Sequence, residues 1–362
     1  MGASHSRWFV TLLLCVVGAT GCSGAPEQVR ESERTTAAAA PRRASAPPAP
    51  SDTPTEGDVP APSAGPTRHH AVSLPALMRH HYDGRRLRVG RVLARTDAYT
   101  RYAVSYLSGD LRISGIMNVP SGRGPFPTLV LNHGYIDPPA YYSGQGLSRE
   151  QDYLARAGYV VLHTDYRNHA SSDKAPASNR RLRLGYTVDV INALRALERS
   201  SLPYVDRDRL GYVGRSMGGG VTLNALVVRP GLVDTAVVYA PVSSDTVDNF
   251  ERWIRGDPEQ ARLTRAIIGR YGAPERSPRF WRDVSPVTFF DRITAPVLVH
   301  HGTADLTCPI RWSRETVAAL RRAGKDVRLH VYPGEPHTFI ADWTLSMRRT
   351  VRFLEHNLRA AG

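Results

Sequence analysis

Six short apolar segments alternate with segments of helical spacing between residues 127 and 334, and this alternation restricts the fold more than any other feature. The apolar segments are PTLVLNHG, YVVLHTDYR, RLGYVG, DTAVVYAP, APVLVHHGTAD and VRLHVYPG. A continuous apolar run such as PTLVLNHG is typical of a strand buried on both faces. Strands that alternate with helices predict a doubly wound, mostly parallel sheet with helices on both faces. Residues 99–120 alternate like two antiparallel strands around Gly109, which predicts an N-terminal hairpin. The fold class is therefore α/β.

The stretch GYVGRSMGGG, residues 211–220, places Ser216 between two glycines, each two residues away. The run RLGYVG before it has the character of a strand, and GGGVTLNALVV after it that of a helix. A strand, a tight G-x-S-x-G turn and a helix form the context of a nucleophile elbow, which exposes a reactive serine hydroxyl. A glycine-rich loop that only connects two elements is the alternative interpretation.

Two later residues could complete a catalytic triad with Ser216. A serine hydroxyl is a weak nucleophile until a base takes its proton, and that base needs a carboxylate to orient it. Asp305 directly follows one apolar segment and His337 lies just after the next, so the chain order is Ser, Asp, His. Taken singly, Asp305 could be a helix cap and His337 a loop histidine. Their order and their positions behind strands favour the triad.

Several segments together carry a resemblance to a known family: LNHGY, ARAGYVVLHTDYRNHASSD, GRSMGGG, SPVTFFDRITAPVLVHHGTAD and PHTF. With them, residues 99–358 resemble the catalytic domain of the prolyl oligopeptidase family, within the α/β-hydrolase fold. The resemblance implies a serine hydrolase that cleaves peptide or ester bonds of small molecules or short peptides through an acyl-enzyme, without a cofactor. It also implies an oxyanion hole formed by the backbone N–H of Met217 and by Tyr135. Tyr135 would act through its hydroxyl, as in the family, or through its backbone N–H, as in many esterases.

The chain departs from the large oligopeptidases of the family, which carry a β-propeller before the hydrolase domain. Such a propeller needs repeating four-stranded blades, and none precede residue 99. An acyl or carbohydrate esterase of the same fold is therefore the alternative function. Residues 243–290 contain helical fragments in place of a strand repeat and could form a small cap lined by Trp253, Trp281 and Arg252. The alternative is that these side chains pack against the edge of the sheet.

The first 68 residues have the composition of a leader followed by a tether. Residues 1–22 contain Arg7, an apolar stretch and small residues that end at Cys22, which predicts a secretory signal. The stretch GATGCSG resembles a bacterial lipobox and predicts a lipid anchor on Cys22, although Ala19 replaces the commoner aliphatic residue. Simple secretion is the alternative. Residues 23–68, rich in Ala, Pro and Ser, predict a disordered tether, which leaves residues 69–362 for the catalytic domain. We thus expect an extracytoplasmic protein. The alternative to an enzyme is a cell-surface lipoprotein that binds a ligand and has no catalytic activity.

Charge and cysteine content exclude several other classes. The net charge is +14, but the arginines are scattered and form no run of five or more, so we predict a solvated surface and no nucleic-acid partner. Cys308 would have no disulfide partner once Cys15 is removed and Cys22 carries lipid. The histidine pairs at 69–70 and 80–81 lack accompanying cysteines or carboxylates, so we expect no metal site. Arg167 or His169 could touch substrate, but we expect both to brace their loop through Asp165 and Asp173, outside the site.

Overall fold

The computed structural model describes residues 69–358. The predicted signal segment 1–22, the lipobox at Cys22 and the predicted tether 23–68 lie outside the described residues. All structural statements below concern the described part of the chain.

The strands form one nine-stranded sheet with the order β1-β2-β3-β5-β4-β6-β7-β8-β9. The six strands from β4 onward pair only in parallel with one another. They are β4 (Phe126–Asn132), β5 (Val160–Thr164), β6 (Val205–Arg215), β7 (Thr235–Tyr239), β8 (Val297–Gly302) and β9 (Val327–Tyr332). Each coincides with one of the six apolar segments. The predicted mostly parallel α/β sheet, with the arrangement of an α/β-hydrolase, is confirmed.

The antiparallel part of the sheet contains the predicted hairpin and one strand more. Strands β2 (Tyr99–Ser108) and β3 (Leu111–Pro120) pair in continuous register around Gly109, whose φ is 58°. An outer strand, β1 (Arg85–Arg95), pairs with β2 through several register shifts. This strand was not predicted, because most of β1 is exposed and its apolar alternation is confined to Leu87 and Val89. Strand β3 joins the parallel part through an antiparallel pairing with β5.

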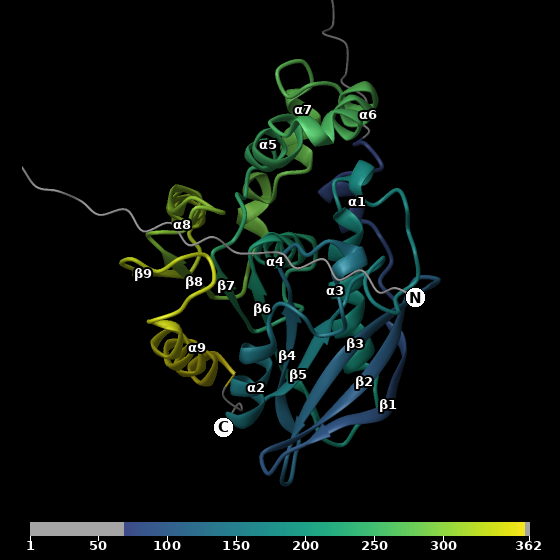
Figure 1. Cartoon of the computed structure of the whole chain (residues 1–362), viewed down its shortest axis with the longest axis vertical. Helices are drawn as coiled ribbons and strands as arrows, with labels where there is room; N and C mark the ends of the chain where they lie inside the picture. Colours follow the sequence, from purple (N-terminus) through teal and green to yellow (C-terminus); the bar gives the residue numbers. More distant parts are fainter. Residues whose placement is uncertain (1–68, 359–362) are drawn as a thin grey trace, which may run out of the picture. The chain divides into compact units, whose positions relative to one another are not determined.

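Helices cover both faces of the sheet and bury two separate sets of apolar side chains. The larger core lies against α3 (Leu184–Glu198), α4 (Met217–Val228) and α8 (Ile310–Arg322). The second lies against α2 (Ser148–Arg156) and α9 (Trp343–Asn357). Because apolar surface is buried on both sides, the central strands carry continuous apolar runs, such as Leu129–Leu131 in β4 and Val297–Val299 in β8. Figure 1 shows α9 and α2 on one side of the strands and α3 with α4 on the other.

Short helices precede the sheet and interrupt its second half. Helix α1 (Leu74–Met78) is capped by Ser73, whose hydroxyl accepts a hydrogen bond from the Ala76 N–H at 3.1 Å. The chain turns back after Met78, and the Tyr82 hydroxyl donates to Leu77 O. The segment 243–290 forms the expected helical fragments. They include α5 (Thr246–Phe250), α6 (Ala261–Tyr271) and α7 (Pro278–Asp283), which lie together at the top of Figure 1.

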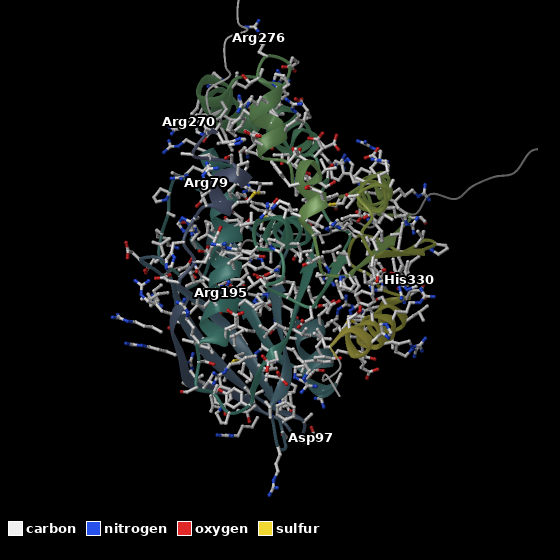
Figure 2. The ribbon with its side chains drawn as sticks, turned by 180° about the vertical axis from the view of Figure 1, so that it is seen from behind. Arg79, Asp97, Arg195, Arg270, Arg276 and His330 are labelled. Carbon is white, nitrogen blue, oxygen red and sulfur yellow. The ribbon has the colours of Figure 1, made fainter. Side chains whose placement is uncertain are left out.

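Charged side chains point outward at widely separated places. Arg79, Arg270 and Arg276 are exposed toward the end of the molecule that carries α6, and Asp97, between β1 and β2, is exposed at the other end (Figure 2). Within residues 69–358, no helix combines the length and the apolar character needed to cross a membrane.

Candidate active site

Ser216 lies at the sharp turn between β6 and α4. Its backbone has φ 55° and ψ −122°, a strained conformation for a residue other than glycine. The glycines on either side allow this turn because there is no room for a side chain. A Cβ on Gly218 would lie 1.9 Å from the backbone oxygen of Asn132, and one on Gly214 would lie 2.4 Å from the backbone oxygen of Gly218. The turn has the geometry that the G-x-S-x-G motif predicts.

Asp305 and His337 contact each other directly. Asp305 follows β8, His337 follows β9, and Oδ2 of Asp305 lies 2.7 Å from Nδ1 of His337. Oδ1 of Asp305 accepts hydrogen bonds from the backbone N–H groups of Thr307 and Cys308, both at 2.8 Å. Burial alone would raise the pKa of Asp305, but hydrogen bonds from His301, His337 and this backbone hold that pKa well below its usual range. The aspartate is therefore a stable anion that can orient the imidazole.

A cavity of about 660 Å³ joins these residues to the elbow. Ser216, Met217, Tyr135 and His337 all line it, whereas Asp305 lies behind His337. No hydrogen bond among the described residues joins the Ser216 hydroxyl to His337, and that hydroxyl makes a long contact of 3.9 Å with the sulfur of Cys308. Catalytic hydrogen bonds are often long before substrate binds. The structure thus brings Asp305 and His337 into contact and places Ser216 on the wall of the same cavity.

The two expected oxyanion donors lie on either side of Ser216. Met217 is the first residue of α4, so its backbone N–H is one of the groups that the helix leaves without an internal partner. Tyr135 follows Gly134, and a Cβ on Gly134 would lie 3.2 Å from the Cβ of Ser216. The Tyr135 side chain is 51% exposed and lies beneath a guanidinium, 4.4 Å from the Arg183 carbon to the ring centroid. Both its hydroxyl and its backbone N–H remain candidates for the second donor.

Two residues near the site were not singled out from the sequence. His301 is fully buried, and its Nε2 lies 3.2 Å from Asp305 Oδ2 and 2.8 Å from Cys308 O. The sequence signal that could have identified His301 is the pair of adjacent histidines at the end of β8. Because side chains alternate between the two faces of a strand, one of the two histidines lies on the side of the loop that carries Asp305. Cys308 is also buried, and burial with the nearby Asp305 charge raises the pKa of its thiol to about 12. The thiol is therefore protonated and cannot serve as a nucleophile at neutral pH.

The segment 243–290 supplies much of the cavity wall opposite the elbow. Its lining side chains are Ser243, Thr246, Asn249, Phe250, Trp253, Ile254, Asp257, Gln260, Leu263, Val284 and Pro286. Of the three residues named from the sequence, Trp253 lines the cavity. Trp281 is 1% exposed and packs against Phe250, so it belongs to the core. Arg252 donates to the backbone oxygens of Leu306 and Thr307 and thereby supports the loop that carries Asp305.

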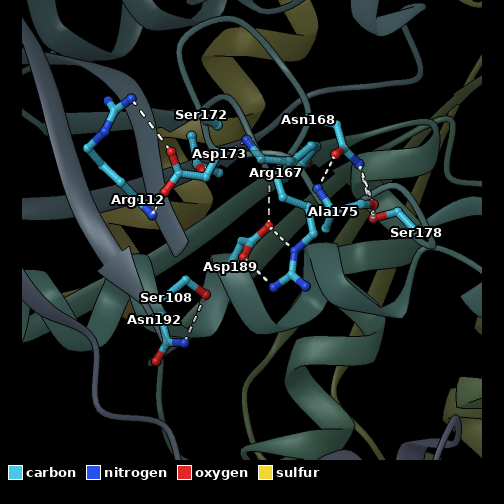
Figure 3. Close-up of polar contacts among 12 residues, drawn as sticks. Ser108, Arg112, Arg167, Asn168, Ser172, Asp173, Ala175, Ser178, Asp189 and Asn192 are labelled. Carbon is cyan, nitrogen blue, oxygen red and sulfur yellow. Dashed lines mark hydrogen bonds and ion pairs between the residues drawn. The ribbon is translucent and has the colours of Figure 1, made fainter. Parts of the chain in front are cut away.

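The loop after β5 is braced as expected, but by a different carboxylate. Arg167 binds Asp189 of α3, with Nη2 2.7 Å from Oδ1 and both Nε and the backbone N–H 2.9 Å from Oδ2 (Figure 3). The prediction of Asp165 and Asp173 as partners was wrong, because Asp165 accepts from the Ser114 hydroxyl and Asp173 from the Arg112 N–H. The ring nitrogens of His169 contact the backbone oxygens of Arg167 and Ile136 instead. A partner on a distant helix leaves no signal in the local sequence.

Nothing in residues 69–358 groups three or more histidine, cysteine or acidic side chains in a way that could hold a metal ion.

Comparisons with known proteins bear on the family and the fold of the chain. Residues 145–360 match the prolyl oligopeptidase family. The chain is 25% identical over 240 residues to YtmA, an uncharacterized peptidase of Bacillus subtilis, covering 66% of this chain and 86% of that protein. Among solved structures, acylaminoacyl peptidase of Pyrococcus horikoshii has a TM-score of 0.60 at 22% identity, covering 74% of this chain and 43% of that one. Acetyl xylan esterase of Paenibacillus sp. R4 has a TM-score of 0.59 at 19% identity, covering 79% and 92%. The chain thus spans less than half of the acylaminoacyl peptidase.

Proposed function

Because this chain belongs to the prolyl oligopeptidase family and is a serine hydrolase, we propose that it cleaves peptide or ester bonds of small substrates through an acyl-enzyme on Ser216. The observation that carries the proposal is the 2.7 Å contact between Asp305 and His337, on the rim of the cavity that Ser216 lines. An isolated loop histidine would need no buried anionic partner.

In the proposed reaction the Ser216 hydroxyl attacks the substrate carbonyl while Nε2 of His337 takes its proton. Asp305 holds the opposite ring nitrogen and stabilises the imidazolium that forms. The negative charge that develops on the carbonyl oxygen is bound by the Met217 N–H and by Tyr135. His337 then gives its proton to the leaving amine or alcohol as the scissile bond breaks. Water, activated by the same histidine, releases the acyl group and restores Ser216.

The apolar part of the cavity wall supports a substrate with a bulky acyl group or side chain. Phe250, Trp253 and Ile254 face the cavity from the segment 243–290, and Val221 faces it from α4. Apolar walls with a few placed polar groups are typical of sites for small molecules. Peptide and ester substrates share this requirement, and the family includes both activities, so an acyl or carbohydrate esterase remains the second candidate.

A fluorophosphonate probe tests the proposal, because it reacts only with an activated serine. We expect the purified protein to be labelled on the peptide that contains Ser216, and labelling to be lost in Ser216→Ala. Ser243→Ala is the matched control, since Ser243 lines the same cavity but hydrogen-bonds Asp248. Labelling that persists in Ser216→Ala would contradict the assignment. A panel of p-nitrophenyl esters and aminoacyl p-nitroanilides then separates esterase from peptidase activity.

A further inference from the structure

Arg183 lines the catalytic cavity but has no part in the proposed reaction. Its guanidinium lies over the Tyr135 ring and approaches the Met217 sulfur, with Nη1 3.8 Å away. It therefore touches both residues that would bind the developing oxyanion. Its Nε donates to Oδ1 of Asn179 at 2.9 Å. Among residues 69–358, no carboxylate lies within ion-pair distance of this guanidinium.

The other charges around the cavity do not neutralise Arg183. Arg215 also lines the cavity, but it is buried in an ion pair with Glu150. Asp257 is the acidic side chain that the wall contributes, from the segment 243–290. Its Oδ1 accepts from the Glu259 N–H at 2.9 Å and caps a turn of its own. The cavity thus contains one arginine without a carboxylate partner, beside the position of the attacked carbonyl.

The backbone holds Arg183 at this place despite a conformational cost. Leu182 and Arg183 have φ angles of 51° and 55°, so two successive residues other than glycine adopt the left-handed region. Residues held in such conformations gather at functional sites. The Arg183 N–H donates to Ser178 O at 2.9 Å, which draws the chain back on itself.

The neighbouring loop fixes this turn. Nδ2 of Asn168 donates to the Ser178 hydroxyl at 3.0 Å, and the Ala175 N–H donates to Oδ1 of Asn168 at 2.6 Å (Figure 3). The Tyr271 hydroxyl of α6 donates to Arg180 O at 2.9 Å from the other side. The backbone at Arg183 is therefore constrained, and the guanidinium itself contacts Asn179, Tyr135 and Met217.

We propose that Arg183 is a specificity residue that binds a carboxylate of the substrate next to the scissile carbonyl. The inference rests on the proposed function, since it concerns the substrate of the same site. A guanidinium can donate two parallel hydrogen bonds to a carboxylate, and Nη2 of Arg183 donates to no protein group among the described residues. Partial burial strengthens such a pair compared with one in bulk water. The expected substrates are acyl groups or short peptides that carry a carboxylate near the bond that is cleaved.

Pairs of p-nitrophenyl esters of equal length test the inference. Each pair contains a diacid monoester and the fatty-acid ester in which a methyl group replaces the carboxylate: succinate with butyrate, glutarate with valerate, adipate with hexanoate. The measured quantity is the ratio of kcat/KM within a pair, corrected for hydrolysis without enzyme. We expect the ratio to favour the carboxylate for at least one length and to fall about ten- to a hundredfold in Arg183→Gln, the range for a hydrogen bond to a charged group. Arg183→Lys should restore part of the preference.

The controls separate this inference from the proposed function. Arg180→Gln removes an exposed arginine of the same turn that does not line the cavity, and its ratio should equal that of the parent. If the fatty-acid esters are cleaved but the ratio is the same in the parent and in Arg183→Gln, the inference is wrong and the hydrolase assignment stands. Equal losses on both members of a pair would mean that Arg183 only supports Tyr135, which also overturns it. If no ester and no nitroanilide is cleaved, the proposed function fails and the inference falls with it.

Discussion

Nε2 of His301 lies 3.2 Å from Oδ2 of Asp305, the same oxygen that contacts Nδ1 of His337 at 2.7 Å. On its other side, Nδ1 of His301 lies 2.6 Å from the Ser313 hydroxyl. A chain of polar contacts therefore runs from α8 to the proposed base. Such outer contacts fix the orientation of a catalytic carboxylate. His301 is a positioning residue in this arrangement, because it acts through Asp305 and does not line the cavity.

Replacing His301 by alanine should lower kcat of the folded enzyme about ten- to a hundredfold, because Asp305 loses a donor and is held less firmly. His301→Gln should recover much of this loss, since its side-chain amide can donate from nearly the same place. Kinetics with a p-nitrophenyl ester, together with urea unfolding, measure both effects. Loss of two buried hydrogen bonds should also destabilise the alanine variant by about 2–3 kcal/mol.

The adjacent His300 provides the matched control. It is equally buried but faces the other side of β8, where its Nδ1 lies 2.7 Å from the Tyr332 hydroxyl and its Nε2 3.0 Å from the Thr350 hydroxyl. His300→Ala should destabilise the fold to a similar extent and leave kcat of the folded fraction nearly unchanged. Equal losses of kcat in the two variants would contradict a positioning role for His301.

The lowered pKa of Asp305 predicts how its contribution to stability changes with pH. A carboxyl group whose pKa is lower in the folded state stabilises that state above its unfolded pKa, near 3.9. This contribution is lost as the pH falls toward the folded value. The difference in free energy of unfolding between the parent and Asp305→Asn should therefore shrink as the pH falls below 4. Urea unfolding at several pH values measures it, and a difference that grows toward acid pH would contradict the assignment.

The space around two glycines, Gly218 at the elbow and Gly269 in α6, predicts opposite effects on stability when each is replaced by alanine. A Cβ on Gly218 would overlap the Asn132 backbone, which cannot move without distorting β4, so Gly218→Ala should cost more than about 2 kcal/mol of stability and most of the activity. Gly269 lies in α6, and a Cβ there would meet nothing within 4 Å. Gly269→Ala should stabilise the protein by about 0.5–1 kcal/mol. Thermal unfolding of both variants tests the pair, and a harmless Gly218→Ala would show that the turn can rearrange.

The sequence predicted those features that depend on local pattern. The strands of the parallel sheet were identified because burial on both faces leaves unbroken apolar runs, as in β4 and β8. The elbow was identified because the glycines around Ser216 have no room for a side chain. Strand β1 was not identified, because its apolar alternation is confined to Leu87 and Val89 and the rest of the strand is mostly exposed.

Features that depend on contacts between distant segments were not predictable in the same way. Arg167, in the loop after β5, pairs with Asp189 of α3. Nothing in the sequence around Arg167 shows that its partner is this carboxylate and not Asp165 or Asp173. The position of Arg183 over Tyr135 likewise depends on how two loops meet. Chain order suggested that Asp305 and His337 would lie close together, but only the folded chain shows that His301 shares the same carboxylate oxygen.

The final prediction concerns Cys22, which lies outside the described residues and stays a sequence-based proposal. If GATGCSG is a lipobox, the cysteine carries several acyl chains, and several chains anchor a protein firmly where one binds only marginally. The protein expressed in a bacterial host should then sediment with membranes, and Cys22→Ser should release it or block its processing. Cys15→Ser is the matched control, because Cys15 would be removed with the leader, and it should leave the distribution unchanged. Fractionation with N-terminal sequencing measures the outcome, and a mature N-terminus elsewhere on a protein found free in the medium would establish simple secretion instead.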